Sequence, residues 1–260
     1  MVYVTGDTHG NFHQFSGGTL FNKFPDQDNL AEDDFVIILG DTGLVWDPRG
    51  YVRPPELWWL NYFEKKPYTL LFIDGNHENF DRLNSDEFEV VDFHGGKAHK
   101  IRDGIYHLMR GEIFELEGKT FFVFGGGESH DIVDGVLNQE DYPDRETLIR
   151  DYNLRTARGQ FLRVNHVSWW KEELPTDEEM THALKNLASH NNKVDFVLTH
   201  SAPREISTLA GTTETNILTE FLDEVMERIT FEKWYFGHHH KNKNVTPKFT
   251  LLYDKVERII

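Results

Sequence analysis

The chain has 260 residues, of which 38% are hydrophobic and 27% charged, a composition typical of a folded globular protein that excludes an intrinsically disordered chain. It contains no cysteine, which excludes disulfides, thiolate metal sites and a cysteine nucleophile, so any metal must be held by oxygen and by imidazole nitrogen. The formal net charge of −17 argues against a broad nucleic-acid surface, although bound metal ions can still create a positive site in an acidic protein.

The first secondary-structure signals in the chain are three short apolar runs, at residues 2–5, 35–39 and 69–73. Each is followed by polar residues and a glycine. Their length, their aliphatic and β-branched composition and their flanks predict buried strands.

The middle of the chain carries closely spaced strand patterns at residues 105–108, 112–116 and 120–124. The Glu117-Gly118-Lys119 segment predicts a hairpin turn between the last two strands. The polar stretch at residues 129–158 then predicts an inserted loop and helix.

The last third alternates helices with strands. Residues 176–189 begin with a capping Thr and acidic first-turn residues, which predicts a helix, and residues 215–229 repeat the same apolar spacing. Residues 195–198 and 234–236 predict buried strands, and the C-terminal residues 245–260 are again strand-like.

This succession of elements predicts an α/β fold, a four-layer α/β/β/α sandwich of two mixed β-sheets flanked by helices. With no repeat or linker in the sequence, we expect a single domain over residues 1–260. Residues from about 125 to 175 are the candidate for an inserted loop and helix cap.

Potential metal ligands follow five of the predicted strands. In four of these five places the ligand stands close to a glycine. Carboxyl ends of strands form sites in α/β sheets, and glycine lets the backbone turn and approach an ion closely. Residues two apart on an extended segment face the same way, so Asp7 can face one point with His9, and His238 with His240. Carboxylate, amide and imidazole groups without thiolate suit Mn, Fe, Zn, Co or Ni. The five blocks are GDTHG at 6–10, GD at 40–41, GNHE at 75–78, THS at 199–201 and GHHH at 237–240.

In the order of these blocks the chain resembles the calcineurin-like metallophosphoesterase superfamily, in its bacterial or phage type. The resemblance implies two divalent metal ions, with Mn²⁺ the first expectation and Fe, Zn, Co or Ni as alternatives. It implies seven ligands: Asp7, His9 and His240 for the first ion, Asn76, His200 and His238 for the second, and Asp41 bridging both. His77 is expected to face the substrate as a general acid or a stabiliser of transition-state charge.

The implied reaction is hydrolysis of a phosphate mono- or diester by a hydroxide held at the two metals, with no covalent enzyme intermediate. A nucleotide or cyclic nucleotide is a reasonable substrate. A serine/threonine-type protein phosphatase is an alternative, but that branch carries an Arg in a GDxVDRG block, and residues 40–47 contain none. A non-catalytic binding scaffold is the other alternative, which the completeness of the ligand set disfavours.

Two further residues are candidates for substrate binding. Arg204 follows the THS block and can bind a phosphate bidentately, and His130 lies in a glycine-rich loop after a predicted strand. Glu78 is expected to support a neighbouring His. The pairs Trp58-Trp59 and Trp169-Trp170 are more readily core residues than stacking platforms.

The expected partner is a small phosphorylated, nucleotide-like substrate, with no extended nucleic-acid surface and no membrane. The N-terminal sequence has no basic segment followed by an apolar stretch, and no apolar run approaches the roughly 20 residues that span a bilayer. We therefore expect a cytoplasmic protein. The sequence is silent on its oligomeric state.

Overall fold

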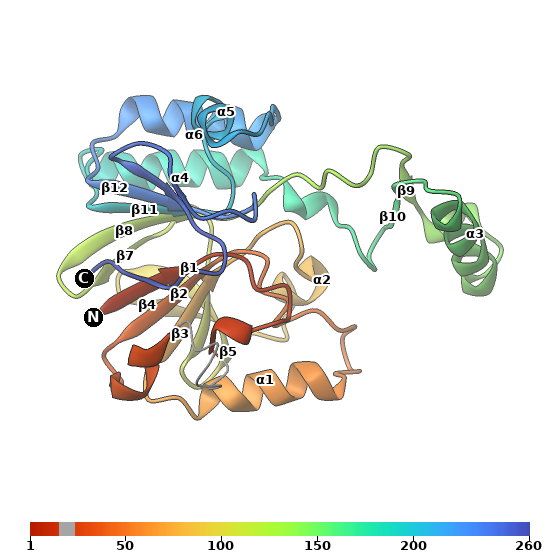
Figure 1. The fold of residues 1–260 in the computed structure, drawn as a ribbon, viewed down its shortest axis with the longest axis horizontal. Coiled ribbons are helices and arrows are strands. Elements are labelled where there is room, and N and C mark those ends of the chain that lie inside the picture. Colours follow the sequence, from red (N-terminus) through yellow and green to blue (C-terminus); the bar gives the residue numbers. More distant parts are fainter. Residues whose placement is uncertain (16–23) are drawn as a thin grey trace.

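The computed structural model describes residues 1–15 and 24–260, and it places two mixed sheets face to face (Figure 1). The first sheet has the strand order β15-β1-β2-β3-β6-β5-β4, with parallel pairing from β1 through β6 and antiparallel strands at both edges. Its strands are β1 (Val2–Thr5), β2 (Phe35–Leu39), β3 (Thr69–Ile73), β4 (Glu89–Phe93), β5 (Gly96–Arg102), β6 (Ile105–Leu108) and β15 (Glu257–Arg258).

The second sheet has the order β13-β14-β12-β11-β8-β7, again parallel in its centre and antiparallel at its edges. Its strands are β7 (Ile113–Leu116), β8 (Lys119–Phe124), β11 (Phe196–Thr199), β12 (Lys233–Phe236), β13 (Lys243–Asn244) and β14 (Phe249–Leu251). The predicted hairpin turn at Glu117-Gly118 is confirmed between β7 and β8.

Helices cover the outer face of each sheet (Figure 1). The helices of these outer layers are α1 (Pro54–Glu64) on the first sheet, and α4 (Asp177–Ser189), α5 (Arg204–Ala210) and α6 (Ile217–Arg228) on the second. Short turns of helix are α2 (Phe80–Leu83), η1 (His13–Phe15), η2 (Pro25–Asn29), η3 (Gln139–Asp141) and η4 (Lys171–Glu173). The predicted four-layer α/β/β/α sandwich is therefore confirmed.

The β2 strand shows why this sequence forms such layers. Successive side chains of a strand face opposite sides, so Val36 and Ile38 pack under α1, whereas Ile37 and Leu39 pack between the sheets. Both faces are buried, which explains the continuous apolar run FVIIL. Among the described residues, no helix has the length and apolar character that crossing a bilayer requires.

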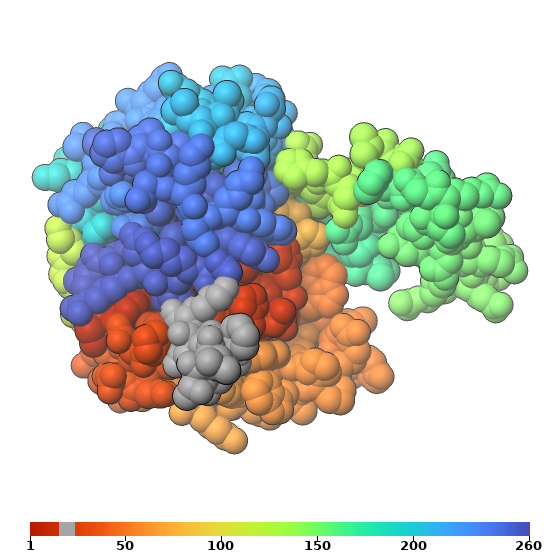
Figure 2. Space-filling model, viewed as in Figure 1, coloured from red at the N-terminus to blue at the C-terminus, as the bar shows by residue number. Residues whose placement is uncertain are grey.

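An arm formed by residues 131–168 projects from the sandwich (Figures 1 and 2). It contains the helix α3 (Arg145–Ala157) and the short strands β9 (Val136–Leu137) and β10 (Arg163–Val164). Leu137, Leu148, Leu162 and Val164 form a small core of its own. At its C-terminal end His166 contacts Asp81 on the sandwich at 2.8 Å.

The structure corrects the sequence analysis in places. The helix α1 and the hairpin β4–β5 were not predicted, and the C-terminal residues 245–260 form only the short strands β14 and β15. Trp58 lies on α1 with 56% of its surface exposed, so its assignment to the core is wrong, whereas Trp170 is fully buried as predicted. The helix begins at two prolines, which are compatible with a first helical turn.

Candidate metal centre

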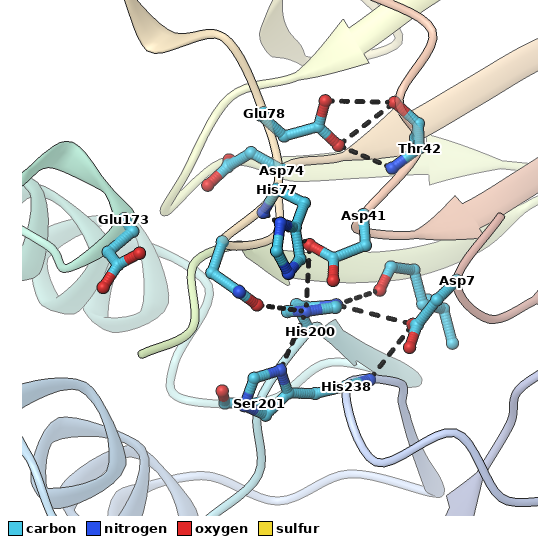
Figure 3. Close-up of polar contacts among 12 residues, drawn as sticks. Asp7, Asp41, Thr42, Asp74, His77, Glu78, Glu173, His200, Ser201 and His238 are labelled. Atoms are coloured by element: carbon cyan, nitrogen blue, oxygen red, sulfur yellow. Dashed lines mark hydrogen bonds and ion pairs between the residues drawn. The ribbon is translucent and has the colours of Figure 1, made fainter. Parts of the chain in front are cut away.

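The ends of five strands meet where the two sheets lie together, and they bring all seven predicted ligands to one place. Figure 3 shows four of them, Asp7, Asp41, His200 and His238. The first sheet contributes Asp7 and His9 after β1, Asp41 after β2 and Asn76 after β3. The second sheet contributes His200 after β11, and His238 and His240 after β12. The ligand groups therefore come from chain segments more than 230 residues apart.

The first group of donor atoms consists of Asp7 Oδ2, His9 Nε2, Asp41 Oδ2 and His240 Nε2. The Nε2 atom of His240 lies 2.8 Å from that of His9 and 3.2 Å from Asp7 Oδ2. His9 Nε2 lies 3.6 Å from Asp41 Oδ2. Such distances are typical of atoms that share one metal ion at about 2.0–2.2 Å each.

The second group surrounds His200 Nε2 (Figure 3). This nitrogen lies 3.1 Å from His238 Nδ1, 3.3 Å from Asn76 Oδ1 and 3.4 Å from Asp41 Oδ1. The two oxygens of Asp41 thus face different groups, Oδ2 the first and Oδ1 the second. One carboxylate between two sets of donors is the arrangement that a bridging ligand requires.

The donor set fits divalent cations. Asp7 Oδ2 is buried and receives no well-directed hydrogen bond from the described residues, because its neighbour at 3.2 Å, His240 Nε2, is itself a candidate donor atom for the same ion. Its neighbours are imidazole nitrogens and carboxylate oxygens, which suit Mn, Fe, Zn, Co or Ni. Near His200, burial opposes the charged form, yet Asp41 and Asp7 raise the pKa of His200 to about 10 in the metal-free protein. A cation at this place would replace that proton.

Hydrogen bonds behind the donor atoms orient two of the ligands. His200 Nδ1 lies 2.7 Å from the carbonyl oxygen of Leu39 and donates to it, which leaves Nε2 as the lone-pair atom toward the second group. Asn76 donates its amide nitrogen to Ser129 Oγ at 3.2 Å, so its Oδ1 remains the acceptor that faces His200. Ser129 in turn donates its hydroxyl to Glu173 at 2.7 Å.

Several ligands lie on unusual backbone. Four of them have a positive backbone φ angle: His9 (47°), Asp41 (48°), His238 (70°) and His240 (48°). The prediction that the paired ligands share an extended segment is therefore wrong, and the left-handed turns aim the side chains instead. Such non-glycine residues cost of the order of 1–3 kcal/mol each and cluster at functional sites.

The glycine-rich loop after β8 passes directly over the second group. A Cβ atom on Gly127 would lie 3.0 Å from His200 and 3.1 Å from Asn76. The backbone N–H of Gly127 donates to the carbonyl oxygen of Glu173 at 3.0 Å, which ties the loop to η4. A side chain at this position would crowd the predicted ligands, so a glycine suits the close approach of the loop.

His77 lies beside the first group of donor atoms, but it belongs to neither the first group nor the second. Its backbone N–H donates to Asp41 Oδ1 at 2.7 Å, and its ring lies 5.2 Å from the ring of His9. Burial lowers the pKa of His77 from its usual 6.5, and the positive charge of Arg163 lowers it further, while Asp41 raises it. Its half-buried ring is thus available to a substrate next to the ligands.

The two predicted substrate-binding residues differ in their surroundings. The ring of His130 lies 5.0 Å from that of His238, so the structure brings it to the edge of the second group. Arg204 pairs with Asp223 at 2.5 Å and with Glu220 at 3.6 Å, both on α6, and no contact joins it to the ligands in the described part of the chain. A role for either in substrate binding stays a prediction.

Glu78 does not support a neighbouring His, so this prediction is wrong. Its buried carboxylate accepts the backbone N–H of Thr42 at 2.7 Å and the Thr42 hydroxyl at 3.0 Å (Figure 3). Burial raises the pKa of Glu78 well above its usual value. The residue therefore holds the turn that follows Asp41.

The supporting residues Ser129 and Glu173, and also Arg163, were not predicted from the sequence. Arg163, on β10 of the arm, donates Nε to Asp131 Oδ2 at 2.9 Å, and both charges act on His77. The position of Ser129 and Asp131 next to the glycine-rich loop was the one available signal. Nothing in the local pattern around Glu173 or Arg163 marks them.

Comparison with protein-family models gives one match, which covers most of the chain. A sequence model for a family described as calcineurin-like phosphoesterase matches residues 1–242. This range includes every strand end that carries a predicted ligand. A comparison with curated proteins gave no match.

Proposed function

This chain belongs to the calcineurin-like phosphoesterase family, and from that premise we propose that it hydrolyses a phosphate mono- or diester at a centre of two divalent metal ions. The single observation that carries the two-ion proposal is the position of Asp41. Its two carboxylate oxygens face two separate sets of donors, at 3.6 Å from His9 and 3.4 Å from His200.

In this proposal seven side chains hold the ions. Asp7, His9 and His240 hold the first ion, Asn76, His200 and His238 hold the second, and Asp41 binds both. Two bound cations supply Lewis acidity toward phosphoryl oxygens and acidify water to make a nucleophile at neutral pH. Mn²⁺ is the ion we would add first.

The residues around the ions position the substrate and move a proton. His77 lies where it can donate a proton from its ring to the departing oxygen, and its backbone N–H meanwhile orients Asp41. Arg163 adds positive charge near His77, which favours the charged phosphate group. In this proposal Arg163, which pairs with Asp131 here, takes the place of the arginine that the GD block of this chain lacks.

We propose a small phosphorylated substrate, such as a nucleotide or cyclic nucleotide, and a cytoplasmic location. The net charge of −17 disfavours a long nucleic acid, whose phosphates an acidic surface repels. We also propose that residues 1–260 act as one domain, in which residues from about 125 to 175 are an insertion that brings Arg163 to the site.

The test is hydrolysis of a matched aryl phosphomonoester and phosphodiester by metal-stripped protein to which Mn²⁺ is added back. We expect turnover that requires the metal and that prefers one ester. Asp41→Asn should remove nearly all of it and should weaken the binding of both ions, because each ion loses a charged ligand. Asp33→Asn, an exposed carboxylate in the turn before β2, is the matched control.

Of three informative outcomes, the first and the third would contradict the proposal. Full activity with full metal content in Asp41→Asn would exclude a bridging role. Absence of turnover on both esters by a protein that binds two ions would point to a narrow natural substrate and would require the assay to be repeated on nucleotides. Absence of both turnover and stoichiometric metal would exclude a metal-dependent enzyme.

A further inference from the structure

A cavity of about 340 Å³ adjoins the candidate metal centre on the side of the first sheet. His9 and His77 form part of its wall, so it begins where a substrate phosphate would lie. Trp46 and Trp59 form further parts of the wall, together with Asp47 and Arg53. A group attached to the phosphate through its departing oxygen would therefore enter this cavity past His77.

Both tryptophans are held in place by other rings. The Trp46 ring lies 5.7 Å from the buried Trp170 and 6.4 Å from His77. The Trp59 ring lies 4.8 Å from the buried Phe12. Each indole is only half-buried, so it has backing on one side and a surface on the other. Rigid aromatic surfaces that line a cavity are suited to stacking with a flat ring.

The charged groups of the cavity are already paired. Glu56 accepts the backbone N–H groups of Trp46 at 2.9 Å and Asp47 at 2.7 Å, and it pairs with Arg82 at 2.6 Å. Asp47 pairs with Arg53 at 2.5 Å. The first turn of α1 begins with Pro54 and Pro55, which have no N–H to offer an anion. With both carboxylates paired to arginines, the wall of the cavity is suited to an uncharged group.

Its size distinguishes between flat groups. A cavity of about 150 Å³ is enough for a single benzene ring. The additional volume here leaves room for a sugar between the ring and the phosphate. A nucleoside thus fits the cavity better than a phenyl group does.

We propose that this cavity binds the nucleoside part of a nucleotide substrate, with the base stacked on Trp46 and Trp59. This inference rests on the proposed phosphoesterase function and names its substrate class. Trp46 and Trp59 then determine specificity, and they act without taking part in the chemical step.

The first experiment measures binding without chemistry, by quenching of tryptophan fluorescence with adenosine, which carries no phosphate and needs no metal. We expect saturable quenching, and we expect Trp46→Ala and Trp59→Ala each to weaken binding about 10-fold or more, as loss of a stacking partner does. Trp46→Phe retains a ring and should restore most of the affinity. Phe161→Ala is the control, because Phe161 is an exposed aromatic residue outside this cavity, whereas the Trp58 ring packs 4.5 Å from the ring of Trp59.

The second experiment compares kcat/KM for adenosine 5′-monophosphate with that for ribose 5-phosphate, which has the same ester and lacks the base. We expect wild type and Phe161→Ala to prefer the nucleotide by about 10-fold or more, and Trp46→Ala and Trp59→Ala to lose the preference. Thermal unfolding of each variant checks that it is folded.

The results separate this inference from the proposed function. Adenosine binding that depends on Trp46 and Trp59 supports the nucleoside site even in a protein that hydrolyses neither ester, and that failure would count against the proposed function alone. Hydrolysis with equal kcat/KM for both esters, and no adenosine binding, would overturn the nucleoside site. A preference for phenyl phosphate without adenosine binding would overturn it in favour of an aryl group.

Discussion

His77 is the residue whose role depends most on where its atoms point. Its backbone N–H orients Asp41, while its ring is free to face a substrate beside His9. A substitution of the side chain therefore removes the ring and keeps the backbone contact. This separation makes His77 a better probe of proton donation than any of the seven ligands.

We predict that His77→Ala keeps the bound metals and lowers kcat by roughly 10²–10⁴-fold, the usual contribution of a general acid. The loss should be largest for esters with poorly departing alcohols, because these need a proton most, and small for p-nitrophenyl esters. Rates over a series of leaving groups, with metal content measured in parallel, provide the check. An equal loss across the series would assign His77 to stabilising charge.

Among elements, the glycine-rich loop and η4 together act on the second group of ligands. Glu173 accepts the backbone N–H of Ser129 at 3.0 Å and its hydroxyl at 2.7 Å, and the same serine receives the Asn76 amide. Burial raises the pKa of Glu173 to about 7. The loop thus sets the orientation of a ligand that it does not itself contain.

We predict that Glu173→Gln weakens binding of the second ion by about 10–100-fold, the usual effect of changing a group behind a ligand. The amide keeps the size of the carboxylate but replaces one acceptor by a donor that faces Ser129. Titration with Mn²⁺ measures the change for each ion, and Glu178→Gln, an exposed neighbour on α4, is the control. Unchanged affinity for both ions would show that Ser129 holds Asn76 without this support.

The hairpin of β5 and β6 contains a pair of buried histidines. His99 Nδ1 lies 3.0 Å from His107 Nδ1, and His107 Nε2 lies 3.2 Å from Asp74. Burial, followed by the charge of His107, lowers the pKa of His99 from 6.5 to about 4. Between about pH 4 and pH 6.5, His99 is therefore neutral in the folded protein and protonated in the unfolded chain.

It follows that the contribution of His99 to stability is fully present above pH 6.5 and is lost as the pH falls toward 4. We predict that the free energy of unfolding decreases by about 1–2 kcal/mol more between pH 7 and pH 5 in the wild type than in His99→Gln. Urea unfolding of metal-free protein at the two pH values measures the difference. The exposed His190→Gln should follow the wild type, and an identical pH dependence in His99→Gln would contradict the assignment.

For the molecule as a whole, the centre joins the two sheets. Asp7, Asp41 and Asn76 follow strands of the first sheet, and His200 and His238 follow strands of the second. Metal ions bound there would link the halves of the sandwich where no disulfide can, since the chain has no cysteine.

We predict that saturating Mn²⁺ raises the unfolding temperature, with a gain of about 2.7 kcal/mol at 100 times the dissociation constant for one ion. Asp41→Asn should lose most of this gain, because both groups of donors depend on it, and Asp33→Asn should keep it. Calorimetry with and without chelator measures the effect. Equal stabilisation of both variants by Mn²⁺ would place the bound metal elsewhere.

The sequence alone determined the central strands, the four layers and the family. The spacing of apolar residues indicates which side chains of a strand or helix are buried, without knowledge of the rest of the fold. The five sequence blocks place their candidate ligands directly after the strands. The sequence also predicted the seven candidate ligands that the structure gathers, from GDTHG to GHHH.

Only the tertiary structure decided which atoms face one another and which residues surround them. The two oxygens of Asp41 divide the ligands into two groups because left-handed turns, not extended strands, aim the side chains. Arg163 reaches the site from the arm, and Arg204 pairs with α6 instead. Trp59 lines a cavity while Trp58 beside it is exposed. Such relations depend on contacts between residues far apart in the chain, which local patterns of composition do not encode.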